Sequence, residues 1–137
     1  MRTFIDSSAF AKRYVDEPGS QAVDDICRNA TELGLSVICI PEIVSALNRR
    51  VRERVLSPSD YAIAKRRLSE DVADSDIVNL TPAVISGATT LLEHSPLRAL
   101  DALHIACALA WKAEIFVTSD EKQMTAARKV RLRTRRV

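Results

Sequence analysis

Apolar residues along the chain fall into two patterns, which predict an alternation of strands and helices. Short apolar, partly β-branched runs predict four strands, at residues 3–5, 35–40, 76–80 and 114–118. Apolar residues at helical spacing predict seven helices, in segments that begin near residues 8, 20, 41, 58, 82, 101 and 121. A last short segment, residues 130–134, predicts an edge strand.

This order of elements predicts one α/β domain. When strands alternate with helices, the strands usually pair in parallel and the helices cover both faces of the sheet. Right-handed crossovers place the carboxyl ends of all the parallel strands at one edge. The chain has 137 residues with no internal repeat and no linker, which fits a single domain over residues 1–137.

The composition favours a cytoplasmic protein with a core of small aliphatic side chains. Hydrophobic residues make up 47% of the chain but aromatic ones only 4%, so Ala, Val, Ile and Leu must fill the core. No apolar stretch is long enough to span a bilayer, and no signal-peptide pattern opens the chain. The three cysteines, Cys27, Cys39 and Cys107, form no CxxC pair, and we expect reduced thiols in the core.

Four acidic residues stand at or just past the expected start of a helix, namely Asp6, Glu42, Asp101 and Asp120. Three of them directly follow a predicted strand, and Asp101 opens the segment 102–113, which is apolar on nearly all sides. One interpretation is helix capping, because acids satisfy free N–H groups there and meet the positive end of the helix dipole. Taken singly, Asp101 and Asp120 fit capping, and Thr118 with Glu121 matches a capping box.

A divalent-cation site is the other interpretation of the same acids. The helix after Asp101 is the most apolar in the chain, so we expect its start to lie deep in the fold. Unpaired carboxylates buried together are costly, and Mg²⁺ or Mn²⁺ would remove that cost. The chain has only His94 and His104, which disfavours zinc, and we interpret His104 as a core histidine or an organiser of the site. Ser8 and Thr118 would orient carboxylates or waters, although helix capping explains these hydroxyls equally well.

Basic residues near such acids suit a phosphodiester substrate. The formal net charge is only +2, but one basic cluster falls within residues 49–54 and another follows Glu121, after which no acidic side chain remains. Acids that hold a metal would activate a water, while arginines bind the flanking phosphates, and Arg49 and Arg50 are our candidates for RNA binding. A solvated helix face and a frayed tail remain the alternative for the two clusters.

Four blocks of the sequence resemble PIN domains, and more narrowly the VapC-type ribonuclease toxins of prokaryotic toxin–antitoxin pairs. The blocks are IDSSAFAKRYVDEPGS, PEIVSALNRR, LRALDALHIACALA and VTSDEKQMTAARK, and they occur in the family's order over nearly the whole chain. The resemblance implies a three-layer α/β/α sandwich with a central, mainly parallel sheet. It also implies a Mg²⁺- or Mn²⁺-dependent endoribonuclease that forms a homodimer and is inhibited by a cognate antitoxin.

The resemblance also implies the roles of individual residues. The catalytic acids of the family fall on Asp6, Glu42, Asp101 and Asp120, of which we assign all but Glu42 as metal ligands. Its small hydroxyl positions fall on Ser8 and Thr118. The chain departs from the pattern at Pro41, where relatives more often carry a small or polar residue, and at residues 128–131, where many relatives carry a glycine before the last strand.

Other function classes fit the sequence less well. A phosphatase of the haloacid-dehalogenase kind would need a second aspartate two positions after Asp6, where Ser8 stands. Three glycines in all cannot form a Gly-rich phosphate loop, and no GxSxG motif surrounds Ser7 or Ser8. The remaining alternative is a PIN-like module that binds RNA or a protein partner without catalysis.

Overall fold

Five strands form the central sheet of the computed structural model, which describes residues 1–137. The strands are β1 (Arg2–Ile5), β2 (Glu32–Ser36), β3 (Asp76–Val78), β4 (Ile115–Thr118) and β5 (Thr134–Arg136). Their order across the sheet is β3-β2-β1-β4-β5, and every neighbouring pair is parallel. The structure therefore confirms the parallel sheet predicted from the alternation of strands and helices.

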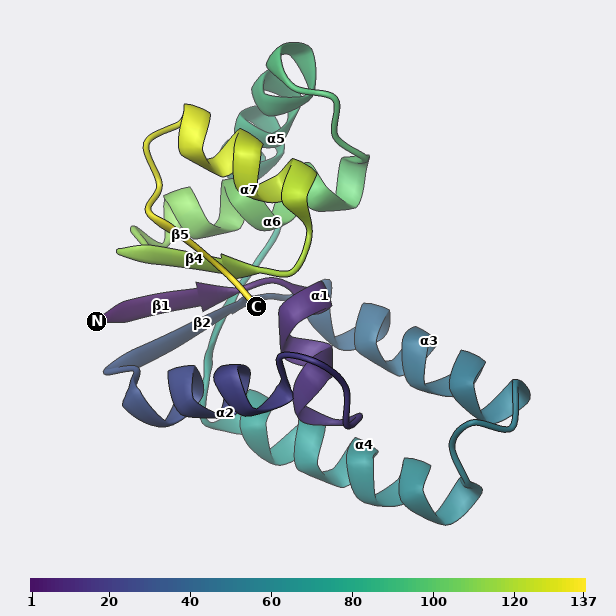
Figure 1. Cartoon of the computed structure of the whole chain (residues 1–137). Helices are drawn as coiled ribbons and strands as arrows, with labels where there is room; N and C mark the ends of the chain where they lie inside the picture. The colour runs from purple at the N-terminus through teal and green to yellow at the C-terminus, as the bar shows by residue number, and fades with distance from the viewer.

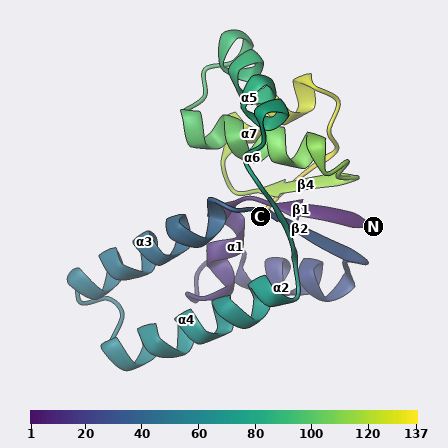
Figure 2. The same cartoon turned by 180° about the vertical axis from the view of Figure 1, so that it is seen from behind.

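Helices cover both faces of this sheet. One face carries α1 (Ser7–Phe10), the 3₁₀ turn η1 (Ala11–Arg13), α2 (Ser20–Asn29), α3 (Cys39–Arg52) and α4 (Pro58–Ala73) (Figure 1). The other face carries α5 (Pro82–His94), α6 (Ala99–Ala110) and α7 (Glu121–Lys129) (Figure 2). The three-layer α/β/α sandwich is thus confirmed.

Alternating side chains of the two central strands divide the core into two halves. Phe4 of β1 and Phe116 of β4 are fully buried on the α6 side of the sheet, with ring centroids 6.1 Å apart. Their neighbours Ile5 and Val117 are fully buried against the helices of the opposite face. This is the period-two pattern of a sheet that is covered on both sides. α6 itself is largely buried, as its apolar sequence predicts.

The segment after β2 differs from the prediction. β2 ends at Ser36 instead of residue 40, and α3 begins at Cys39, so Pro41 lies within the first helical turn. Leu35 and Cys39 are buried in the same half of the core, and therefore one apolar run covers the end of a strand and the start of a helix. Glu42 consequently stands in the first turn of α3 and not directly after a strand.

The last strand lies later in the chain than predicted. β5 covers Thr134–Arg136 rather than residues 130–134, because α7 ends at Lys129 and the chain turns through Arg131 before the strand. Arg131 has a φ of 67°, in the left-handed region that favours glycine. An arginine thus makes a turn for which glycine is the least strained residue.

The order of the strands changes direction at β1, and this places Asp6 at a topological switch point. β1 pairs with β2 on one side and with β4, far away in sequence, on the other. Asp6 directly follows β1, and its backbone amide donates to the Val117 carbonyl of β4 at 3.1 Å. In open α/β sheets, ligands bind in the crevice outside the strand ends at such a point.

The cysteines agree in part with the expectation of reduced thiols in the core, because Cys27 is only half-buried. All three cysteines are free thiols, and Cys39 and Cys107 are buried. Burial raises the pKa of Cys39 to about 12, so this thiol stays protonated at neutral pH. None of the helices combines the length and the apolar character that crossing a bilayer would require.

Replacing Gly34 by alanine is expected to destabilise the sheet. A Cβ atom on Gly34 of β2 would lie 2.8 Å from Cε3 of Trp111 and 3.0 Å from Cδ2 of Phe4. The indole cannot retreat freely, because its Nε1 donates to Asp76 and its ring lies under the guanidinium of Arg2. We expect Gly34→Ala to lower the free energy of unfolding by about 1–3 kcal/mol, measured by urea denaturation.

Gly87→Ala is the matched control for this variant. Gly87 lies within α5, and a Cβ atom there would meet only the Ala106 Cβ, at an ordinary contact distance of 3.7 Å. Alanine should raise the free energy of unfolding by about 0.5–1 kcal/mol, since glycine is unfavourable inside a helix. A Gly34→Ala protein as stable as the wild type would contradict the close packing of Trp111 on β2.

Candidate active site

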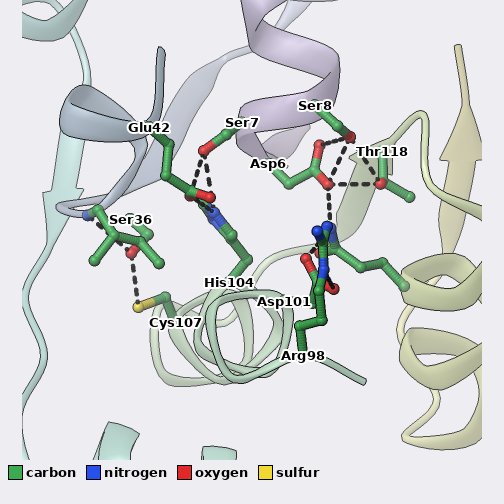
Figure 3. Close-up of polar contacts among 12 residues, drawn as sticks. Asp6, Ser7, Ser8, Ser36, Glu42, Arg98, Asp101, His104, Cys107 and Thr118 are labelled. Carbon is green, nitrogen blue, oxygen red and sulfur yellow. Dashed lines mark hydrogen bonds and ion pairs between the residues drawn. The ribbon is translucent and has the colours of Figure 1, made fainter. Parts of the chain in front are cut away.

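Asp6 is fully buried and accepts hydrogen bonds from several neighbouring groups. It caps α1, and its Oδ1 accepts from the Ala9 amide at 3.0 Å. The Ser8 hydroxyl lies 2.8 and 2.9 Å from the two carboxylate oxygens, and the Thr118 hydroxyl donates to Oδ2 at 2.6 Å (Figure 3). The Nε2 of Gln123 donates to the same Oδ2 at 2.8 Å. These contacts fix the orientation of the carboxylate at the end of β1.

Burial nevertheless makes the negative charge of Asp6 unfavourable. Desolvation raises the pKa of Asp6 above its ordinary value of 3.8, although the charge of His104 and the hydrogen bonds from Thr118, Ala9 and Ser8 act in the opposite direction. The hydrogen bonds therefore compensate only part of the cost of the buried charge. A positive charge beside the carboxylate would reduce that cost further.

Asp101 faces Asp6 across the side chain of Gln123. Gln123 is buried in the first turn of α7, and its Nε2 donates both to Asp6 Oδ2 and, at 3.2 Å, to Asp101 Oδ1. Oxygens of two carboxylates thus lie around one nitrogen atom. The other oxygen of Asp101 accepts from Nε of Arg98 at 3.2 Å, and the Arg98 side chain is 83% exposed.

The interpretation of Asp101 as a helix cap is wrong. α6 begins at Ala99, so Asp101 stands inside its first turn, and the cap residue Arg98 makes no side-chain capping bond. The buried carboxylate of Asp101 therefore points to the acidic site rather than to free backbone N–H groups.

Glu42 belongs to a second group of side chains, which is centred on His104 (Figure 3). Oε1 of Glu42 lies 2.6 Å from Nε2 of His104 and accepts from the Ser7 hydroxyl at 2.8 Å. Burial alone would raise the pKa of Glu42, but the hydrogen bond and the charge of His104, together with the Ser7 hydroxyl, lower it on balance. His104 is buried in α6 and organises this carboxylate, which was one of the two roles expected from the sequence.

Asp120 caps α7, as its capping interpretation predicts. Its Oδ1 accepts from the Gln123 backbone amide at 2.9 Å. The capping box between Thr118 and Glu121 is wrong, because the Thr118 hydroxyl accepts instead from the Asp120 amide at 3.0 Å. Neither Ser8 nor Thr118 is an N-cap, and both hydroxyls donate to Asp6.

Three of the four acids line one cleft at the carboxyl edge of the sheet. The cleft has a volume of about 270 Å³, and its walls include Glu42, Asp101 and Asp120. Arg49 and Arg50 of α3 also line it. The Arg50 guanidinium lies 3.3 Å from the Glu17 carboxylate, whereas Arg49 is exposed and makes no ion pair. The cleft therefore offers acids and at least one unpaired arginine to the same ligand.

Two further hollows differ in their relation to these acids. One, of about 690 Å³, adjoins the cleft and shares Arg98, Asp101 and Asp120 with it. The other, of about 510 Å³, surrounds Arg13 between α2 and α4 and includes Glu32 and Leu33 at the amino end of β2, whereas the acids lie at the carboxyl edge of the sheet. Arg13 is already paired with Asp24 at 3.2 Å and with Asp71 at 3.1 Å, so we regard this second hollow as a structural ion-pair network.

The oxygen donors of Asp6 and Asp101 fit a hard divalent cation. In the present arrangement, no three acidic, histidine or cysteine side chains gather closely enough to form a complete protein cage for a metal ion. Mg²⁺, however, is commonly held by only one or two carboxylates and keeps several waters. Two carboxylates that converge on one point suit Mg²⁺ or Mn²⁺ better than zinc, and Nε2 of the neighbouring His104 is engaged by Glu42.

Sequence analysis missed two side chains that complete the site, Gln123 and Ser7. The inward direction of Gln123 could have been inferred, because it lies on one helical stripe with the buried Ala126 and Ala127. Nothing in the sequence distinguishes the role of Ser7 from that of the neighbouring Ser8. Only the tight first turn of α1 directs the two neighbouring hydroxyls to different carboxylates.

Comparison with known proteins identifies relatives over most of the chain. The family model of the PIN domain matches residues 3–129. Ribonuclease VapC45 of Mycobacterium tuberculosis is 33% identical over 107 residues, which make up 78% of this chain and 74% of that protein. Ribonuclease VapC49 from another strain of the same species matches to the same extent.

Solved structures share the fold at lower sequence identity. VapC20 of Mycobacterium tuberculosis, a toxin that cleaves the sarcin–ricin loop, superposes with a TM-score of 0.70 at 17% identity and covers 90% of this chain and 94% of its own. VapBC2 of Rickettsia felis, bound to a DNA fragment from its promoter, gives a TM-score of 0.71 at 14% identity, with coverage of 100% and 99%. At these identities the similarity concerns the fold alone.

The raised pKa of Asp6 predicts a specific pH dependence of stability. Between pH 3.8 and the raised value, the folded protein binds more protons at this site than the unfolded chain, so stability falls as the pH rises. The Asp6→Asn variant has no carboxyl group at this position, so its stability lacks this pH dependence. We therefore expect its free energy of unfolding, relative to wild type, to increase from about pH 4 upward, by at most about 1.4 kcal/mol per pH unit.

Urea denaturation of both proteins at a series of pH values, in buffers that contain EDTA, would measure this difference. A difference that stays constant or decreases as the pH rises would show that the protein compensates the buried charge of Asp6 fully.

Proposed function

The chain belongs to the PIN domain family, and we propose that it is a Mg²⁺- or Mn²⁺-dependent endoribonuclease, the toxin of a type II toxin–antitoxin pair. The relatives that match most of its length are named ribonucleases, which supports the hydrolysis of RNA phosphodiesters. A cytoplasmic location fits such a substrate. The non-catalytic PIN-like module remains the alternative against which the proposal is tested.

One observation carries the proposal, namely the convergence of Asp6 and Asp101 at the switch point of the sheet. Their carboxylate oxygens lie 2.8 and 3.2 Å from a single nitrogen atom of Gln123. Capping does not explain Asp101, and burial makes the charge of Asp6 unfavourable. A fold that keeps two such carboxylates together gains most when a cation binds between them.

The surrounding residues would have different roles in phosphodiester hydrolysis. We assign Asp6 and Asp101 as the principal cation ligands, with Asp120 at the border of the site. A bound divalent cation supplies positive charge that stabilises the phosphoryl oxygens and lowers the pKa of a water. Ser8 and Thr118 hold the Asp6 carboxylate in one orientation through their hydroxyl groups.

Glu42 and the arginines would act on the substrate side of the cleft. The lowered pKa keeps Glu42 ionised, and His104 and Ser7 hold it toward the cleft, where it can accept a hydrogen bond from the attacking water. Arg49, which is exposed at the rim and makes no ion pair, is suited to a phosphate of the bound RNA. Arg50 would have to exchange Glu17 for such a phosphate.

We also propose an antitoxin partner and a homodimer. Toxin–antitoxin complexes are among the solved structures that share the fold. An antitoxin segment would compete with RNA for the acidic cleft. Large apolar side chains remain exposed on α5 and α6, at Ile85, Leu92, Leu100 and Leu109, and a second copy of the chain could cover them.

Cleavage of a mixed RNA pool with Mg²⁺, with Mn²⁺ and with EDTA would test the proposed activity. We expect metal-dependent cleavage, and we expect Asp101→Asn and Glu42→Gln to reduce its rate at least about a hundredfold, since even indirect support of a metal site is worth about 10–100-fold. Asp60→Asn is the control. Asp60 occupies the same position in the first turn of α4 that Asp101 occupies in α6, but it is exposed and far from the cleft.

The two variants and the control separate the site from general helix effects. Equal loss of activity in Asp60→Asn and Asp101→Asn would show that the helix dipole, and not the site, is affected. RNA binding without cleavage under every metal condition would favour the non-catalytic module.

Arg49→Ala should weaken RNA binding and make it less sensitive to salt. One lost phosphate contact is expected to reduce the slope of log K against log salt by about 0.7 for single-stranded RNA. The measurement uses Asp101→Asn protein, so that the RNA stays intact. Arg66→Ala, which removes an exposed arginine of α4 outside the cleft, should leave the slope unchanged. Equal slopes for both arginine variants would show that Arg49 does not contact an RNA phosphate.

A further inference from the structure

Gln123 lies between the two carboxylates that we assign to the cation. Its side chain comes from α7, three residues after the cap Asp120, and only 3% of the residue is exposed. Nε2 donates to Asp6 Oδ2 at 2.8 Å and to Asp101 Oδ1 at 3.2 Å. Both N–H groups of the amide are therefore used by carboxylates of the proposed site.

This arrangement excludes a cation that would bind the same two oxygens from the side of the amide. Mg²⁺ approaches carboxylate oxygens to about 2.0–2.1 Å. A cation that contacts both Asp6 Oδ2 and Asp101 Oδ1 from the side of Gln123 would occupy the space that Nε2 now fills. The N–H groups of Gln123 would also direct their positive ends at the cation.

The other half of the amide makes no hydrogen bond that would oppose its movement. Its Oε1 is buried and accepts no hydrogen bond in the structure, although buried polar atoms nearly always have a partner. The two bonds from Nε2 are the only hydrogen bonds that the amide makes in its present orientation. Rotation of the amide would therefore break no hydrogen bond apart from the two that the cation replaces.

We propose that the side-chain amide of Gln123 takes the place of the divalent cation between Asp6 and Asp101, and that cation binding displaces it from both carboxylates. The inference rests on the proposed function, because it needs a cation at this pair of acids. Gln123 is then a positioning residue. It compensates the buried charges when no cation is bound, and it lowers the affinity for the cation by competing for the same oxygens.

Side-chain amide resonances report this displacement directly. The chain has two glutamines, Gln21 and Gln123, and Gln21 lies on the surface of α2, where it donates to Asp25. In ¹⁵N-labelled full-length protein treated with EDTA, Mg²⁺ is added while the NH₂ cross-peaks are followed. We expect the Gln123 pair to shift at the same Mg²⁺ concentration as the backbone amide of Asp101. The Gln21 pair should stay in place.

Removal of the amide should strengthen cation binding. We expect Gln123→Met, which keeps the length of the side chain without its donors, to bind Mn²⁺ about tenfold more tightly than wild type in calorimetric titrations, because no hydrogen bonds to the carboxylates are lost on binding. Gln21→Met is the matched control and should bind Mn²⁺ as wild type does. The spectrum of Gln123→Met also assigns the Gln123 cross-peaks by their disappearance.

The possible outcomes separate this inference from the proposed function. If the Asp101 amide shifts with Mg²⁺ and the Gln123 pair does not, the cation site stands and the displacement is refuted. Weaker or unchanged Mn²⁺ binding by Gln123→Met would equally overturn it. If Mg²⁺ moves no cross-peak of the site, both the displacement and the metal-dependent activity are contradicted.

Discussion

The structure depends on the cost of burying the Asp6 carboxylate at the end of the central strand. An isolated charge in this position would be very unfavourable, so the surrounding elements supply donors to it. The first turn of α1 brings the Ala9 amide and the Ser8 hydroxyl, the end of β4 brings Thr118, and α7 brings Gln123. These elements are far apart in the sequence, and the pairing of β1 with β4 is what joins them. The pairing of β1 with β4 therefore brings the donors to the carboxylate, and the buried carboxylate in turn requires these elements to stay together.

The two groups of acids at the sheet edge differ in how their charge is compensated. Glu42 is half-buried beside His104 and Ser7, which lower its pKa in spite of the desolvation. Asp6 is fully buried, and desolvation outweighs its hydrogen bonds and raises its pKa. A cation gains most where a buried carboxylate is least compensated, and for this reason we propose the cation beside Asp6 and Asp101 and not beside Glu42. The sequence-based assignment, in which Glu42 is catalytic but is not a metal ligand, stays a prediction.

The parts of this protein that could be predicted from its sequence are those that local pattern determines. The apolar segment after Asp101 predicts the buried helix α6, and alternation predicts the parallel sheet. The end of β2 could not be predicted, because Leu35 and Cys39 pack in the same half-core from a strand and from a helix. Gln123 was missed for a different reason. The stripe that it shares with Ala126 and Ala127 indicates that it points inward, but its partners lie 117 and 22 residues away and no local pattern identifies them.

The placement of Gln123 suggests how such a site can fold before any cation is present. Two buried carboxylates that face each other repel, and a fold that waited for a metal ion would have to overcome this repulsion during assembly. An amide has two N–H donors and no net charge, so it can satisfy both carboxylates at once without forming a permanent ion pair. A lysine in the same place would compensate the charges better, but a cation would then have to displace a buried positive charge. In the displacement that we propose, the glutamine satisfies both acids in the folded protein and gives way to the cation.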